Sequence, residues 1–164
     1  AGIVHRDLKS DNVFLVGEQP RVVLMDFGLA KPDVLSQSHP LLSLGGSIVG
    51  TAAYMSPEQV LGKKVTPASD VYALGVILFE MMTGTVPWKA DSSIDAAMAR
   101  LDAEAPLASS RRDDVPSAWD AVIARCLERD PARRHGTVDE VWSQLRSLAK
   151  APPRARRKLL PTVL

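Results

Sequence analysis

The chain has 164 residues, which is enough for one domain and hardly for two. Its 20 basic and 19 acidic residues leave a net charge of +1, and this balance favours neither a nucleic acid nor a strongly acidic partner. The only cysteine is Cys126, which excludes an intrachain disulfide and a Cys-rich zinc site.

Two short β-prone runs lie near the front of the chain, at residues 13–16 (VFLV) and 21–25 (RVVLM). The stretch between them contains Gly17 and Pro20, which favour a turn, so the sequence predicts a small β-hairpin. Residues 31–50 are rich in Ser, Gly and Pro and predict a long loop. A loop of this length inside a compact domain is usually functional or disordered.

Four helices are predicted behind this loop. The first begins near Ser69 and Asp70, either of which could be its N-cap, and Gly84 stands where it should end. Its residues are apolar nearly all round, which is typical of a helix buried at the centre of a domain. The other three predicted helices cover residues 92–104, 116–129 and 137–150.

The last predicted helix opens with Thr137 and Glu140, which have the spacing of a capping box. It also carries an apolar stripe at helical spacing, formed by Val138, Val141, Leu145 and Leu148. A small hairpin followed by several helices predicts a mainly α domain, α+β overall.

Four polar residues could share a site. Asp7, Lys9 and Asn12 lie within six residues, before the first predicted strand, and Asp26 follows the second. A carboxylate beside a lysine could be a solvated salt bridge and nothing more. If the hairpin instead brings Asn12 and Asp26 together, their oxygens could hold Mg²⁺, which prefers a few oxygen ligands together with phosphate oxygens. Asp7 could then accept a proton from an alcohol, and Lys9 could neutralise charge on a transferring phosphoryl group.

Several motifs, taken in order, resemble those of the protein kinase family. HRDLKSDN at residues 5–12 is similar to the catalytic loop H-R-D-L-x-x-x-N, and DFG follows at residues 26–28. GTAAYMSPE resembles the end of a kinase activation loop, and SDVYALGVILFEMMTG resembles the buried central helix of the kinase C-lobe. CLERDPARR resembles the late element whose Arg pairs with the Glu of S-P-E. The resemblance covers residues 3–149 and is closest in kind to bacterial Ser/Thr kinases of the eukaryotic-like type.

The resemblance implies a role for each residue of the site. Asp7 matches the catalytic base, and Asn12 and Asp26 match the two Mg²⁺ ligands. Lys9 resembles the lysine that Ser/Thr kinases place against the γ-phosphate of ATP, and Thr51 resembles the threonine that contacts the base and this lysine. Tyrosine kinases typically lack that lysine, so the resemblance favours transfer to Ser or Thr.

Other residues match supporting positions of the nucleotide site. Leu15 resembles the apolar floor beneath the adenine ring, and Phe27 resembles a packing residue that positions Asp26. Gly28 gives the turn after Asp26 its conformational freedom. His5 is expected to be a structural core histidine rather than a proton donor.

Three charged residues have two possible interpretations, an ordinary structural role and the specific role that the resemblance implies. Asp70 could be a plain N-cap, or it could hold backbone amides of the catalytic loop, as the resemblance implies. Glu58 and Arg134 could be unrelated surface charges, or they could form the buried ion pair of the family.

The predicted loop could also carry a switch. In kinases of this pattern a phosphate on the activation loop often pairs with the arginine before the catalytic Asp, which is Arg6 here. Ser47 is the best placed of the candidate acceptors, which are Ser36, Ser38, Ser43, Ser47 and Thr51. The alternative is that these serines only make the loop flexible.

No Gly-rich phosphate loop, strand lysine or partner glutamate of a kinase N-lobe is found in the sequence. We therefore expect residues 1–149 to be the C-lobe of a kinase, with the N-lobe in a parent chain, and to be weak or inactive alone. The alternatives are a non-catalytic kinase-like interaction module and a truncated gene product.

Residues 150–164 form a basic, Pro- and Arg-rich tail. This tail is either a solvated segment or a juxtamembrane one, and in the second case the tether must lie beyond residue 164. The expected cofactors are ATP and Mg²⁺, the expected partners are proteins with Ser or Thr acceptors, and the expected location is cytoplasmic.

Overall fold

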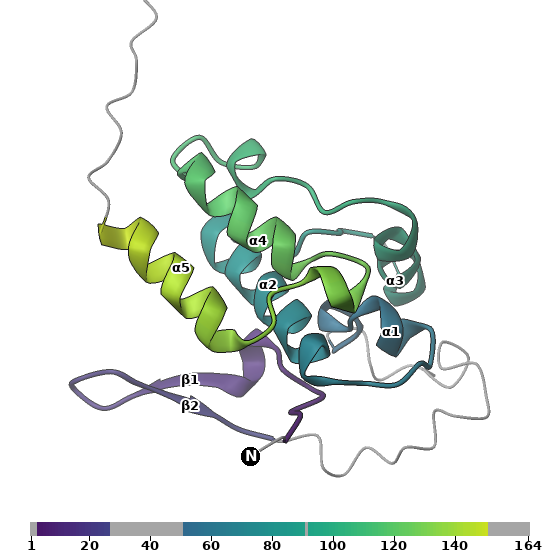
Figure 1. Ribbon diagram of the computed structural model, residues 1–164, viewed down its shortest axis with the longest axis horizontal. Coiled ribbons are helices and arrows are strands. Elements are labelled where there is room, and N and C mark those ends of the chain that lie inside the picture. The colour runs from purple at the N-terminus through teal and green to yellow at the C-terminus, as the bar shows by residue number, and fades with distance from the viewer. Residues whose placement is uncertain (1–2, 27–50, 91, 151–164) are drawn as a thin grey trace, which may run out of the picture.

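The computed structural model describes residues 3–26, 51–90 and 92–150. A small β-hairpin lies on one side of a helical body (Figure 1). The hairpin consists of β1 (Val13–Val16) and β2 (Arg21–Leu24), which pair antiparallel with Val13 opposite Leu24 and Val16 opposite Arg21. The predicted hairpin is therefore confirmed, and most of its side chains are exposed.

Five α-helices form the described part of the body. They are α1 (Pro57–Val60), α2 (Pro67–Thr83), α3 (Ser93–Asp102), α4 (Asp120–Cys126) and α5 (Val138–Lys150). Short 3₁₀ turns complete it, at Ser10–Asn12, Thr51–Tyr54, Ala108–Ser110, Ser117–Trp119 and Pro131–Arg133. The domain is mostly helical with one small two-stranded sheet, as the sequence predicts.

Helix α2 begins earlier than expected. Its N-cap is Thr66 rather than Ser69 or Asp70, and Pro67 stands in the first turn, where a missing N–H does no harm. The Oγ of Ser69 accepts a hydrogen bond from the Thr66 amide at 3.2 Å. The helix ends as predicted at Gly84, whose φ of 75° needs a residue without a Cβ.

Helix α2 packs closely against α4. A Cβ at Gly75 would lie 2.6 Å from the Cβ of Cys126, so any larger residue at this position would force the two helices to shift. Buried residues of α2 and α4 form two apolar clusters, one around Tyr72, Phe79 and Ile123, the other around Val71 and Cys126. Burial raises the pKa of the Cys126 thiol to about 12, so it is an inert core group.

A ladder of aromatic rings and guanidinium groups crosses this core. The rings of Tyr72 and Trp88 stack with centroids 6.3 Å apart. The guanidinium of Arg134 lies over Tyr72 at 4.9 Å, and that of Arg100 lies over Trp88 at 5.6 Å. These cation–π contacts help to compensate for the burial of two positive charges.

The two C-terminal helices differ in detail from the prediction. Residues 116–129 form a 3₁₀ turn and the short α4 rather than one helix. Beyond Cys126, the carbonyls of Glu128 and Arg129 accept hydrogen bonds from the Arg134 guanidinium instead of continuing the helix.

Only half of the predicted capping box of α5 is present. The amide of Glu140 donates to Thr137 Oγ1, but the Glu140 carboxylate accepts from Gly136 rather than from Thr137. Val138, assigned above to the apolar stripe, is half exposed, so the stripe begins at Val141.

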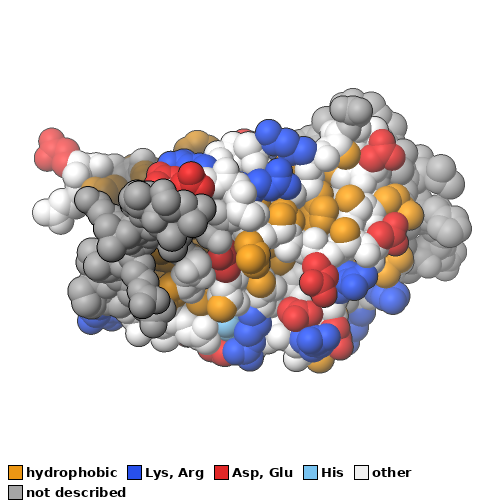
Figure 2. All heavy atoms as spheres, turned by 90° about the horizontal axis from the view of Figure 1, so that it is seen from above, with side chains coloured by type: hydrophobic (Ala, Val, Ile, Leu, Met, Phe, Trp, Pro, Cys, Tyr) orange, Lys and Arg blue, Asp and Glu red, His pale blue; other side chains and the backbone are white. Residues whose placement is uncertain are grey.

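Charges of both signs are interspersed over the face seen in Figure 2, in keeping with the balanced composition. No helix in the described ranges is long and apolar enough to cross a membrane.

Candidate active site

The hairpin brings Asn12 and Asp26 to the same end of the sheet. The Asn12 carbonyl accepts a hydrogen bond from the Met25 amide at 3.0 Å, which extends the ladder by one residue beyond Val13 and Leu24. Asp26 follows directly and has a φ of 54°. A left-handed backbone at a non-glycine residue is strained and often marks a functional position.

The amide of Asn12 connects this end of the hairpin to the loop before it. Asn12 is buried, and its Nδ2 donates to the carbonyl of Asp7 at 3.0 Å. Because the amide nitrogen is used in this way, the Asn12 side-chain oxygen is the atom left to act as a ligand. Asn12 and Asp26 thus offer an amide oxygen and a carboxylate, which are ligands that suit Mg²⁺ bound together with phosphates.

No group of three or more His, Cys, Asp or Glu that could hold a metal occurs within residues 3–26, 51–90 and 92–150. This finding is compatible with Mg²⁺, which takes one or two protein ligands and completes its shell with phosphate and water. It gives no support to a structural zinc site in the same ranges.

The loop that carries Asp7 has a strained backbone. Arg6, the residue before Asp7, has a φ of 66° although it is not a glycine. The carboxylate of Asp70, in α2, accepts hydrogen bonds from the amides of His5 at 2.7 Å and of Arg6 at 3.0 Å. Asp70 therefore holds backbone amides of this loop, and it is not the N-cap of its helix.

The ring of His5 has a structural environment. His5 is buried, its Nε2 lies 3.2 Å from the Met25 carbonyl, and the Asp7 amide donates to its Nδ1 at 3.4 Å. Both ring nitrogens thus contact the backbone of the residues that flank the site, which fits the expected core histidine.

Besides Asp70, another residue, which the sequence analysis did not single out, contacts the loop that carries Asp7. Gln59, in α1, donates from Nε2 to the carbonyl of Arg6 at 3.0 Å. Only its position beside Glu58 could have drawn attention to it, because a glutamine after S-P-E carries no chemical signal of its own.

The segment before α1 is connected to the loop through Tyr54. The Tyr54 hydroxyl donates to Glu80 at 2.6 Å and lies 2.7 Å from Ser10 Oγ. Burial, followed by the contact with Glu80, raises the pKa of Tyr54 to about 12, so the hydroxyl keeps its proton. Arg6, Asp7, Tyr54, Gln59 and Asp70 line one small hollow between the loop and α2.

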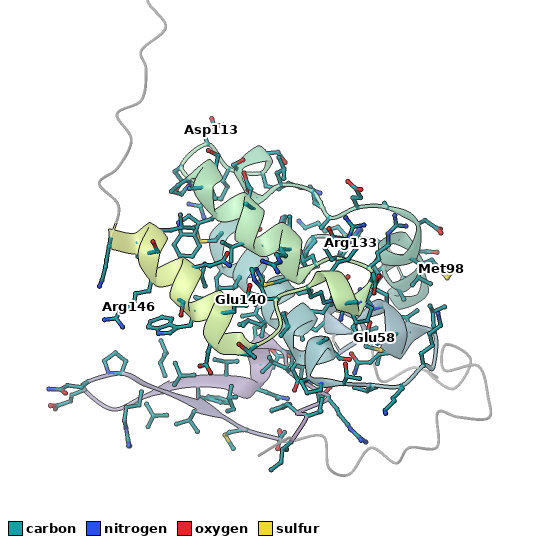
Figure 3. All side chains as sticks on the ribbon, viewed as in Figure 1. Glu58, Met98, Asp113, Arg133, Glu140 and Arg146 are labelled. Carbon is teal, nitrogen blue, oxygen red and sulfur yellow. The ribbon has the colours of Figure 1, made fainter. Side chains whose placement is uncertain are left out.

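Glu58 and Arg134 form a buried ion pair. Two guanidinium nitrogens of Arg134 lie 2.8 Å from the two carboxylate oxygens of Glu58, and Ser69 Oγ donates to the same carboxylate at 2.7 Å. Burial opposes ionisation of Glu58, but the hydrogen bonds from Arg134 and Ser69 outweigh it and lower the Glu58 pKa. Figure 3 marks Glu58 in α1, within the helical body.

The remaining predicted site residues vary in how far they are described. Lys9 is partly buried just before the 3₁₀ turn Ser10–Asn12, and Leu15 is 72% exposed on β1. Phe27, Gly28 and Ser47 lie outside the described residues, as do the other candidate serines of the loop and residues 151–164. Thr51 begins a 3₁₀ turn, but its side chain is not described.

Comparison with known proteins identifies the family. The family model of the protein kinase domain matches residues 1–145. Serine/threonine-protein kinase PknL of Mycobacterium tuberculosis is 39% identical over 150 residues, which are 92% of this chain and 36% of that protein. Serine/threonine-protein kinase pkn3 of Myxococcus xanthus is 37% identical over 155 residues, 92% of this chain and 28% of that protein.

A third relative is the probable serine/threonine-protein kinase PknB of Bifidobacterium longum, 37% identical over 139 residues, or 85% of this chain and 20% of that protein. The chain therefore spans about a third of the length of the first relative and a smaller share of the other two. On the match of the family model and on these identities, the chain belongs to the protein kinase family, in its bacterial, eukaryotic-like branch.

Proposed function

We propose that this chain supplies the catalytic-loop part of a serine/threonine protein kinase that transfers the γ-phosphoryl group of ATP, with Mg²⁺, to Ser or Thr of a protein. The observation that carries the proposal is the grouping of Asp7, Asn12 and Asp26 by one hairpin and one strained loop. The named Ser/Thr kinases among its relatives support it.

Each residue then has a defined task. Asp7 accepts the proton of the attacking hydroxyl, and Asn12 and Asp26 offer oxygens to the metal. Lys9, two residues after Asp7, neutralises charge on the phosphoryl oxygens. Mg²⁺ with ATP supplies the transferable phosphoryl group and the positive charge that stabilises it in flight.

The finer parts of the proposal concern the rest of the domain. Residues 1–149 act as the C-lobe, α2 is its buried central helix, and residues 31–50 belong to the activation loop, which GTAAYMSPE closes. The N-lobe, which holds the other half of the phosphate site, belongs to the parent chain, and without it transfer is weak or absent. The exposed apolar side chains of the hairpin, such as Leu15 and Val22, fit a surface that meets this lobe and the adenine ring.

The test is a kinase assay on the native full-length protein with Mg²⁺ and labelled ATP. Asp7→Asn should lower kcat by roughly 10²–10⁴-fold, the usual contribution of a general base. Asp139→Asn, the same chemical change at an exposed residue of α5, is the control and should leave kcat unchanged. The affinity for Mg²⁺-ATP should be similar in all three proteins.

Two results would contradict the proposal. One is a wild-type protein that transfers no phosphate, which would favour a non-catalytic kinase-like module. The other is an Asp7→Asn variant that works at nearly the normal rate.

The proposed cytoplasmic location rests on the need for ATP, and fractionation of the source cells would test it.

A further inference from the structure

The peptide group between Arg6 and Asp7 is held at an unusual angle. A φ of 66° at Arg6 is unfavourable for a residue with a Cβ, so the neighbouring structure must impose it. Asp70 binds the Arg6 amide on one side, but this contact alone does not set the plane of the next peptide group. The carbonyl of Arg6 belongs to that next group, and Gln59 donates to it at 3.0 Å.

The side chain of Gln59 is itself oriented by two other contacts. Its Oε1 accepts hydrogen bonds from the amide of Ser56 at 2.9 Å and from Ser56 Oγ at 3.0 Å. Since both of these groups donate, the oxygen of the amide must face Ser56 and the nitrogen must face Arg6. Ser56 is fully buried, so this orientation is fixed by the start of α1.

Two neighbouring residues of α1 connect this helix to the helical body and to the loop that carries Asp7. Glu58 binds Arg134 and Ser69, which anchors α1 to the helical body. Gln59, the next residue, reaches the loop instead. A shift of α1 would therefore move the hydrogen-bond donor away from the Arg6 carbonyl.

On these contacts, and given the proposed kinase function, we infer that Gln59 is a positioning residue: its amide fixes the Arg6–Asp7 peptide group and thereby directs the carboxylate of Asp7. Gln59 does not take part in the chemistry. It couples the segment that ends at α1 to the catalytic base, so any event that displaces α1 misdirects Asp7.

Two variants of the full-length kinase separate this role from a general loss of structure. Gln59→Glu keeps an oxygen for Ser56 but places a carboxylate oxygen against the Arg6 carbonyl. Gln59→Met removes both contacts at similar volume. Gln144→Glu, in α5 and outside the hollow that Gln59 lines, is the matched control for the charge change.

Both Gln59 variants should lower kcat by about 10-fold, the effect of one lost hydrogen bond to a polar group that stays buried, while KM for ATP changes less than about twofold. The carboxylate introduced by Gln59→Glu is partly buried and faces a carbonyl oxygen, and both conditions raise its pKa above the ordinary value of a glutamate. As the pH falls, this carboxylate therefore gains a proton and can again donate to Arg6. The ratio of kcat for this variant to that of wild type should therefore rise as the pH falls from about 8.5 to about 5.5, and the ratio for Gln59→Met should stay flat. Arg6, Asp7, Tyr54 and Asp70 are the titratable groups that line the same hollow, and they are common to all the proteins compared.

Hydrogen exchange gives a readout that does not need activity. The amide of Asp7 should exchange about 10-fold faster in Gln59→Met than in wild type, and amides in the middle of α2 should be unchanged. A kcat within twofold of wild type in both variants, or exchange at Asp7 that does not change, would overturn the inference. A wild-type protein without Mg²⁺-ATP-dependent transfer would overturn the proposed function instead, and the exchange result would still decide the role of Gln59.

Discussion

Replacing Arg134 with methionine should strongly destabilise the fold. The Arg134 side chain is fully buried, and all five of its N–H groups have acceptors: the Glu58 carboxylate twice and the carbonyls of Ala68, Glu128 and Arg129. Arg134→Met would leave a buried carboxylate without its counter-charge. Losing one partner of such a pair costs about 3–5 kcal/mol, and the three orphaned carbonyls favour the upper end of that range.

Equilibrium unfolding in urea, followed by tryptophan fluorescence, measures this loss. At this chain length it corresponds to a fall in Tm of roughly 6–20 °C. Arg125→Met is the matched control, because Arg125 forms an exposed ion pair with Glu140 at 3.1 Å and should contribute at most about 1 kcal/mol.

A double variant tests the cause. Glu58→Leu with Arg134→Met removes the buried charge together with its partner, so its loss should be smaller than the sum of the two single losses. A loss below about 1 kcal/mol for Arg134→Met, or strictly additive losses, would refute the reasoning from the buried pair.

Two further predictions concern acid and packing. The folded state lowers the pKa of Glu58, so the ionised carboxylate stabilises the fold fully above the ordinary pKa of a glutamate, and this stabilisation is lost as the pH falls through the lowered pKa. In urea titrations from about pH 7 to about pH 3, the difference in unfolding free energy between wild type and Glu58→Gln should therefore shrink. A difference that does not depend on pH would contradict the assignment. Gly75→Ala should lower the unfolding free energy by roughly 1–3 kcal/mol, because the new Cβ would overlap Cys126 and Leu127. This loss should outweigh the better helix propensity of alanine. An unchanged or higher urea midpoint would show that α2 and α4 can move apart.

The sequence predicted the parts of the molecule that depend on local patterns. The hairpin follows from two β-prone runs and a turn, and the end of α2 follows from Gly84. The start of α2 was wrong because the local pattern could not distinguish Thr66 from Ser69 and Asp70 as the cap.

The rest of the site depends on contacts between distant residues. Gln59 reaches Arg6 across 53 positions, and the left-handed backbone of Arg6 is invisible in the sequence because arginine has no preference for it. Arg100 is a similar case. Nothing in an amphipathic helix predicts that an arginine will be buried against Trp88 with its Nη1 donating to Met55.

The position of these partners along the chain has a consequence for how the protein is made. The hydrogen bonds that hold the amides of His5 and Arg6 come from Asp70 in α2, which is 65 positions after His5 and 64 after Arg6. During synthesis on the ribosome, the loop therefore emerges long before the carboxylate that binds its amides. It cannot adopt its native conformation until α1 and α2 have been synthesised and packed. The centre of the proposed chemistry is translated before the helices that give it its working shape, so a substitution that slows the packing of α2 would delay maturation of the enzyme without touching a residue of the site.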